Sequence, residues 1–75
     1  MISDEIFLGE FLLTQESVHK WVKYESPIVY QLGYIENNIF HSLYTGRVTE
    51  HPKETLINQC DYKKYTHFKF KYCDH

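Results

Sequence analysis

The chain has 75 residues, a formal net charge of −2 and 17% aromatic residues. This length fits one domain over residues 1–75, and the apolar stretches are too short for a transmembrane helix or a signal peptide. Two cysteines are too few for the disulfide framework of a small secreted protein. We therefore expect an intracellular protein that does not enter membranes.

The aromatic content and the charge distribution both point to binding. Seven Tyr, five Phe and one Trp are more rings than so small a core can enclose, and surplus rings gathered on a surface mark a partner site. Residues 1–38 contain six acidic and two basic side chains, whereas residues 39–75 contain four acidic and six basic ones. The absence of Ala and the single Arg suggest an AT-rich coding genome, as in many bacteriophages and low-GC bacteria.

The first segment, residues 5–13, is ambiguous between a strand and a helix. Gly9 and the many bulky apolar residues favour a buried strand, while Ser3 is a suitable cap for a helix over residues 4–13. We favour the strand.

A helix is predicted over residues 15–24. Thr14 has the hydroxyl of a good N-cap, and Leu13 occupies the first position of a hydrophobic staple with Val18. Val18, Trp21 and Val22 have helical spacing and are predicted to face the core.

A β-hairpin is predicted next. Residues 28–35 alternate with period two after Pro27, and residues 39–45 form a second extended run. Asn37 and Asn38 between them suit the left-handed backbone of a tight turn.

A short helix and a last strand complete the chain. His51 and Pro52 are the predicted cap and first residue of the helix, whose Leu56, Ile57 and Cys60 would face inward. The strand over residues 66–73 has one apolar face and one basic face, the latter formed by His67, Lys69 and Lys71.

These elements predict an α+β domain of order β-α-β-β-α-β, the split βαβ arrangement called ferredoxin-like, with two short helices on one face of a small antiparallel sheet. The alternative, in which residues 4–13 are helical, is α-α-β-β-α-β around a three-stranded sheet.

Catalytic and metal-binding patterns are weak. Cys60, His67, Cys73 and His75 are potential zinc ligands, but their spacing is not that of a zinc module, and we expect free thiols and no metal. The chain has no nucleophile motif and no glycine-rich phosphate loop, so we expect no catalytic residue and no cofactor. A small nuclease that pairs His67 with a carboxylate is the least favoured hypothesis.

We predict a binding site on the face of the sheet that the helices leave open. Trp21, Phe68, Phe70 and Tyr72 have periodic places in a core, whereas other rings do not. The predicted site residues are Phe40, Tyr44, Tyr65, His67, Lys69 and Lys71.

The predicted function is a non-enzymatic inhibitor or adaptor that binds a protein partner, with a phage-type inhibitor of a host enzyme as a special case. The alternative is weak binding of single-stranded RNA, against which stands the interpretation of the basic face as an edge strand protected by lysines. Exposed sheet edges also suggest a homodimer.

Overall fold

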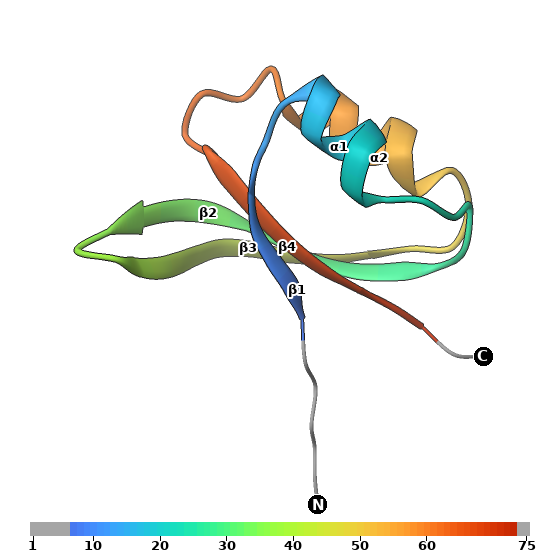
Figure 1. The fold of residues 1–75 in the computed structure, drawn as a ribbon, viewed down its shortest axis with the longest axis horizontal. Coiled ribbons are helices and arrows are strands. Elements are labelled where there is room, and N and C mark those ends of the chain that lie inside the picture. Colours follow the sequence, from blue (N-terminus) through green and yellow to red (C-terminus); the bar gives the residue numbers. More distant parts are fainter. Residues whose placement is uncertain (1–6, 74–75) are drawn as a thin grey trace, which may run out of the picture.

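The computed structural model describes residues 7–73 of the chain. The predicted order β-α-β-β-α-β is confirmed (Figure 1). The strand assigned to the first segment is also confirmed for its described part, and Ser3, the cap of the helical alternative, lies outside the described residues. The elements are β1 (Leu8–Leu12), α1 (Gln15–Trp21), β2 (Ile28–Glu36), β3 (Ile39–Val48), α2 (Pro52–Gln59) and β4 (His67–Tyr72).

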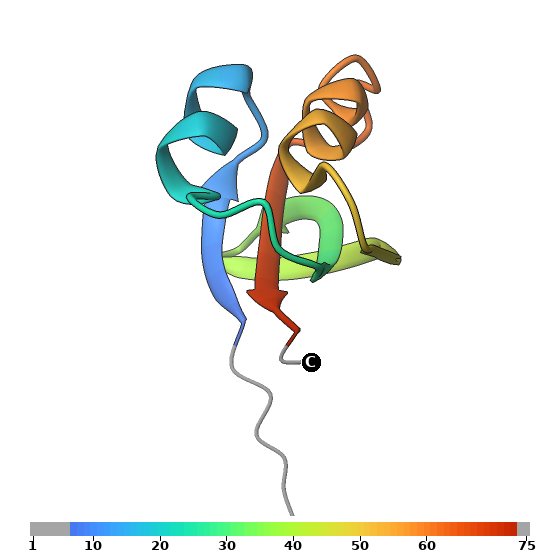
Figure 2. The same ribbon diagram turned by 90° about the vertical axis from the view of Figure 1, so that its right-hand side faces the viewer.

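The four strands form one antiparallel sheet in the order β1-β4-β2-β3. Helix α1 connects β1 to β2 across β4, and α2 connects β3 to β4 across β2, so both βαβ units are split by one strand. Strands β4 and β2 are central, and β1 and β3 are the edges. Figure 2 shows both helices above the same face of the sheet. We call the opposite face, which neither α1 nor α2 covers, the open face.

Single residues set the backbone conformation at the starts of the two helices and in the turn between β2 and β3. The Thr14 hydroxyl accepts a hydrogen bond from the Ser17 amide at 3.1 Å and so caps α1 as predicted. Asn37 and Asn38 have φ values of 55° and 64°, the left-handed turn expected between β2 and β3. His51 stands at the N-cap of α2 with φ 56° and ψ 56°, and its side chain makes no capping hydrogen bond.

Helix α1 ends at Trp21, three residues before its predicted end. The next residue, Val22, is extended, with φ −90° and ψ 94°. The amides of Lys23 and Tyr24 donate to the hydroxyl of Tyr72 on β4, at 2.9 and 3.3 Å. A contact with a residue almost fifty positions away therefore stabilises the exit from the helix, which no local pattern could have predicted.

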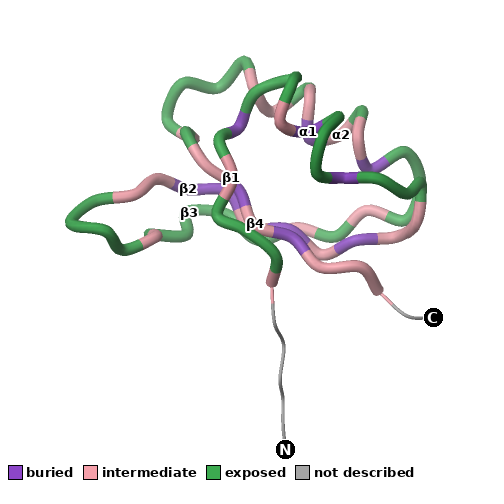
Figure 3. The backbone as a smooth tube through the Cα atoms, in the orientation of Figure 1, coloured by how far each residue is buried: buried purple, intermediate pink, exposed green. Residues whose placement is uncertain are grey.

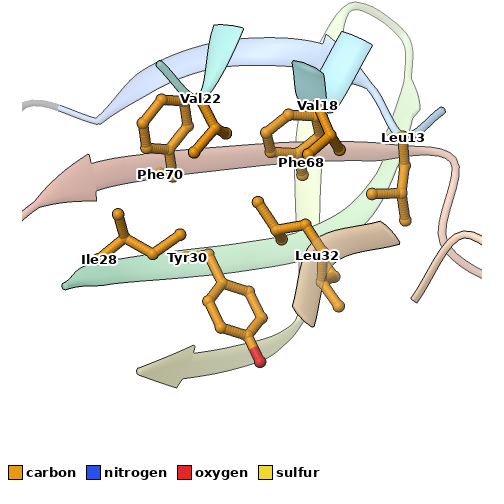
Figure 4. Packing of buried hydrophobic residues seen from close by; sticks show 9 residues of the cluster. Leu13, Val18, Val22, Ile28, Tyr30, Leu32, Phe68 and Phe70 are labelled. Carbon is orange, nitrogen blue, oxygen red and sulfur yellow. The ribbon is translucent and has the colours of Figure 1, made fainter. Parts of the chain in front are cut away.

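The core lies between the helices and the helix-facing side of the two central strands. Figure 4 shows Phe68 and Phe70 of β4 beneath Val18 of α1 and Val22, the residue that follows α1, and all four side chains are fully buried. The buried segments in Figure 3 accordingly follow β2, β4 and the inner sides of the helices. The buried hydrophobic residues are Leu13, Val18, Val22, Ile28, Tyr30, Leu32, Leu56, Phe68 and Phe70.

Trp21 lies at the rim of this core, and the prediction that it belongs inside is wrong. Its ring remains 39% exposed and stacks on Phe11 of β1, with centroids 4.7 Å apart and planes 11° from parallel. Phe11 in turn packs against the buried rings of Phe68 and Phe70, at 5.4 and 6.1 Å between centroids. No helix within residues 7–73 is long and apolar enough to cross a membrane.

Candidate functional site

The open face is built by the side chains that alternate with the core residues. On β4 the two buried Phe rings point to the helices, so His67, Lys69 and Lys71 point the other way. Paired residues of neighbouring strands share a face, and the register therefore extends this assignment across the sheet. The open-face positions of β2, β3 and β4 are Val29, Gln31, Gly33, Ile35, Phe40, Ser42, Thr45, Arg47, His67, Lys69 and Lys71.

Lysine and phenylalanine side chains interleave at the centre of this face. The ammonium nitrogen of Lys69 lies 5.0 Å from the centroid of the Phe40 ring and 5.8 Å from that of the Phe7 ring. The Lys71 nitrogen lies 5.9 Å from the Phe7 ring. Such cation–π contacts contribute about 0.5–1 kcal/mol each at exposed sites. Because β2 lies between β3 and β4, the Lys69 and Phe40 side chains meet across an intervening strand.

The open-face positions of β2, β3 and β4 carry a charge opposite to that of the whole chain. Arg47, Lys69 and Lys71 occupy open-face positions of β2 to β4, and none of those positions carries an acidic residue. The chain as a whole has a net charge of −2. Three of the eight Lys and Arg residues of the chain thus lie on these strands without an acidic residue beside them, and such a cluster produces a positive local potential.

Tyr44 lies on the helix-facing side, and its predicted place on the open face is wrong. The ladder pairs Tyr44 with Leu32, but it pairs Ser42 with Gly33, so β3 has one extra residue at this point. A β-bulge of one residue inverts the faces of the side chains that follow it. For this reason Phe40 and Tyr44 point to opposite sides, although their even spacing predicts a shared face.

Tyr44 and Tyr65 instead belong to a second surface, which we call the tyrosine hollow. It encloses about 300 Å³ and is lined by Tyr44, Gln59, Tyr62, Lys64 and Tyr65. Tyr65 meets the edge of Tyr62 at 6.3 Å, and the Lys64 nitrogen lies 5.3 Å from its ring. The six predicted site residues are therefore divided: Phe40, His67, Lys69 and Lys71 share the open face, and Tyr44 and Tyr65 share the hollow.

The buried neighbour of the hollow is Tyr30. Its ring lies 6.0 Å from that of Tyr44 and, in Figure 4, extends from β2 away from Phe68 and Phe70. Burial raises the pKa of the Tyr30 hydroxyl above its ordinary value, and the charge and hydrogen bond of Tyr44 raise it further. The Tyr30 hydroxyl accordingly stays protonated to higher pH than that of a free tyrosine.

His67 is oriented by its neighbour in the chain. The Thr66 hydroxyl lies 2.8 Å from Nδ1 of the imidazole, within hydrogen-bonding distance. A nuclease mechanism would need a carboxylate beside this ring, and the open-face positions of β2 to β4 supply none.

A larger groove between α1 and α2 escaped the sequence analysis. It encloses about 750 Å³, and Lys53 and Glu25 approach each other at its side, with 4.0 Å between charged atoms. Two strands, β2 and β3, separate His19 from His51 along the chain, and only the packing of α1 against α2 brings the two residues to one groove. Its lining is His19, Glu25, Thr49, Glu50, His51, Lys53, Glu54 and Ile57. Within residues 7–73, no three His, Cys, Asp or Glu side chains converge as metal ligands.

Both cysteines are free thiols. The Cys60 thiol donates to the Leu56 carbonyl at 3.6 Å, and burial raises its pKa, with a further contribution from Asp61. A raised pKa reduces the thiolate fraction and with it the nucleophilicity of Cys60.

Comparison of the chain with protein-family models, curated proteins and solved structures finds no match. We therefore infer function from the surfaces of this chain alone.

Proposed function

We propose that this chain is a non-enzymatic binding domain, an inhibitor or adaptor, that holds the acidic surface of a protein partner against its open face. The interleaving of Lys69 and Lys71 with the rings of Phe7 and Phe40 carries the proposal. It lies on a sheet face that neither helix covers (Figure 2). Aromatic anchors surrounded by polar and charged groups are what protein interfaces use for affinity and specificity.

The proposed partner is acidic because of the charge segregation on the sheet. An approaching protein meets Arg47, Lys69 and Lys71 on this face, and positive potential there speeds encounter with an acidic patch. Phe7 and Phe40 are only half-buried, so a partner can remove further apolar surface from water. Phe40, Lys69 and Lys71 stand on paired strands, whose backbone is already ordered before binding, and this limits the conformational entropy that binding costs.

Affinity capture from cells of the source organism tests the proposal when it compares variants. The wild-type chain is compared with Lys69→Glu/Lys71→Glu on the open face and with Lys20→Glu/Lys23→Glu on the exposed side of the α1 region. Both double variants change the net charge equally. We expect a protein that is retained by the wild type and the control but lost by the open-face variant. A partner retained equally by all three proteins would contradict the proposal.

Single-stranded nucleic acid is the second candidate, supported by the two phenylalanine rings beside Lys69. Open sheet faces bind single strands by stacking bases on rings and neutralising phosphates with cations. Fluorescence anisotropy with a labelled single-stranded RNA at low salt measures such binding directly. If the three open-face cations each neutralise one phosphate, a plot of the logarithm of the association constant against the logarithm of the salt concentration has a slope of about −2. A flat titration would remove this candidate and leave the protein partner.

A further inference from the structure

The two edges of the sheet differ in how well they are protected from another strand. Edge strand β1 has only five residues, and its register with β4 shifts between Leu8 and Phe11. Irregular, short edges resist pairing with a further strand. Edge strand β3 has ten residues, the longest strand of the sheet, and in the ladder it is joined to β2 alone.

Strand β3 also lacks the side chains that usually guard an edge. Between Ile39 and Val48 it carries one formal charge, Arg47, and no proline. Ile39, Leu43 and Tyr44 are 60%, 51% and 47% exposed. Long edges with exposed apolar residues and few charges are templates for pairing with another chain.

We propose that β3 pairs antiparallel with β3 of a second copy of this chain, so that two sheets join into one of eight strands. A two-fold axis perpendicular to the sheet keeps all helices on one side and brings both open faces to the other. The dimer thus presents one continuous surface that contains both sets of Lys69 and Phe40 side chains. This inference is independent of the partner that the open face binds.

The charge pattern of β3 permits a second copy as the occupant of this edge. When two copies of β3 pair antiparallel, the residue numbers of every opposed pair add up to the same value. Arg47 therefore lies opposite Arg47 of the second copy in only one of the possible registers. Every other register places Arg47 opposite an uncharged residue or beyond the pairing, because the strand carries no other charge. Like charges directly opposed across strands are destabilising, and β3 avoids them almost entirely.

The bulge between Ser42 and Tyr44 shapes this pairing without preventing it. It divides β3 into residues 39–42 and residues 44–48, each of which keeps a regular ladder with β2. Because bulges interrupt regular spacing of backbone groups, continuous pairing between copies is expected within one of these halves. Amide exchange in each half identifies which one pairs.

The test measures mass in solution by light scattering and native mass spectrometry over a concentration series up to millimolar. The edge variant Ser42→Lys/Thr45→Lys places two lysines on exposed positions of β3, and the control Gln15→Lys/Asn58→Lys adds the same charge on exposed helix positions. We expect a dimer for the wild type and the control, and a dissociation constant raised at least about tenfold in the edge variant. A wild-type monomer throughout, or an edge variant as dimeric as the control, would overturn the proposal.

Hydrogen–deuterium exchange of the unmodified chain gives an answer that does not depend on how the variants fold. Amides in β3 should exchange more slowly at high concentration than at low concentration, while those in β1 should not change. Exchange in β3 that does not respond to concentration would also overturn the proposal. Because no partner is present, these results are separate from those of the capture experiment.

Discussion

The hydroxyl group of Tyr72 joins the last strand to the end of the first helix. It accepts hydrogen bonds from the amides of Lys23, at 2.9 Å, and Tyr24, at 3.3 Å. The substitution Tyr72→Phe keeps the ring and removes this acceptor. Each net hydrogen bond stabilises a fold by about 0.5–1.5 kcal/mol, and water partly replaces bonds to exposed amides, so we expect a loss of about 1–2 kcal/mol. That is a large fraction of the roughly 4–11 kcal/mol expected for a domain of this length.

Urea unfolding followed by far-UV circular dichroism measures this loss. The matched control is Tyr24→Phe, which removes a hydroxyl from a neighbouring ring that is 63% exposed and should change stability by less than about 0.5 kcal/mol. Tyr72→Phe should lower the urea midpoint without changing the slope, and the melting temperature should fall by about 4–8 °C per kcal/mol. If Tyr72→Phe and the control unfold at the wild-type midpoint, the hydrogen bonds to Tyr72 do not stabilise the end of α1.

Three further predictions concern the backbone and pH. An Ala side chain at Gly33 would drive its Cβ into the backbone oxygen of His41, so Gly33→Ala should lower the stability by several kcal/mol, and a wild-type melting curve would disprove this. His51→Gly relieves a left-handed backbone conformation, φ 56°, and should gain about 0.5–1 kcal/mol; an unchanged or lower urea midpoint would contradict this. Because folding raises the pKa of Tyr30 above 10.0, the folded state holds this proton more tightly, and stability should fall as the pH rises past 10.0. Urea midpoints on either side of that pH should show a smaller decline in Tyr30→Phe, and equal declines would refute the assignment.

Much of the fold could be predicted because its signals are local. The Thr14 hydroxyl caps the next turn of backbone, and Asn37 and Asn38 adopt the left-handed conformations of a tight turn. Alternation along β4 separates buried Phe68 and Phe70 from the basic residues of the open face. In each case the cause acts over a few residues, which a sequence pattern can express.

The candidate site could be predicted only in part. Phe40, Lys69 and their neighbours on β4 share a surface because period-two alternation holds along each segment. Tyr44 does not join them, since the extra residue of the bulge inverts the face, and a bulge leaves no clear mark in the local pattern. Phe7 completes the site from the residue before β1, whose path depends on pairing with β4.

The sequence by itself determined the kinds and order of the elements and the opposed apolar and basic faces of β4, because backbone propensity and side-chain alternation act between near neighbours. The tertiary structure alone decided the strand order β1-β4-β2-β3, the early end of α1 beside Tyr72 and the place of Trp21 at the rim of the core, stacked on Phe11. It also decided which long edge remains open. These features depend on contacts between residues far apart in the chain, whose packing has to be satisfied all at once.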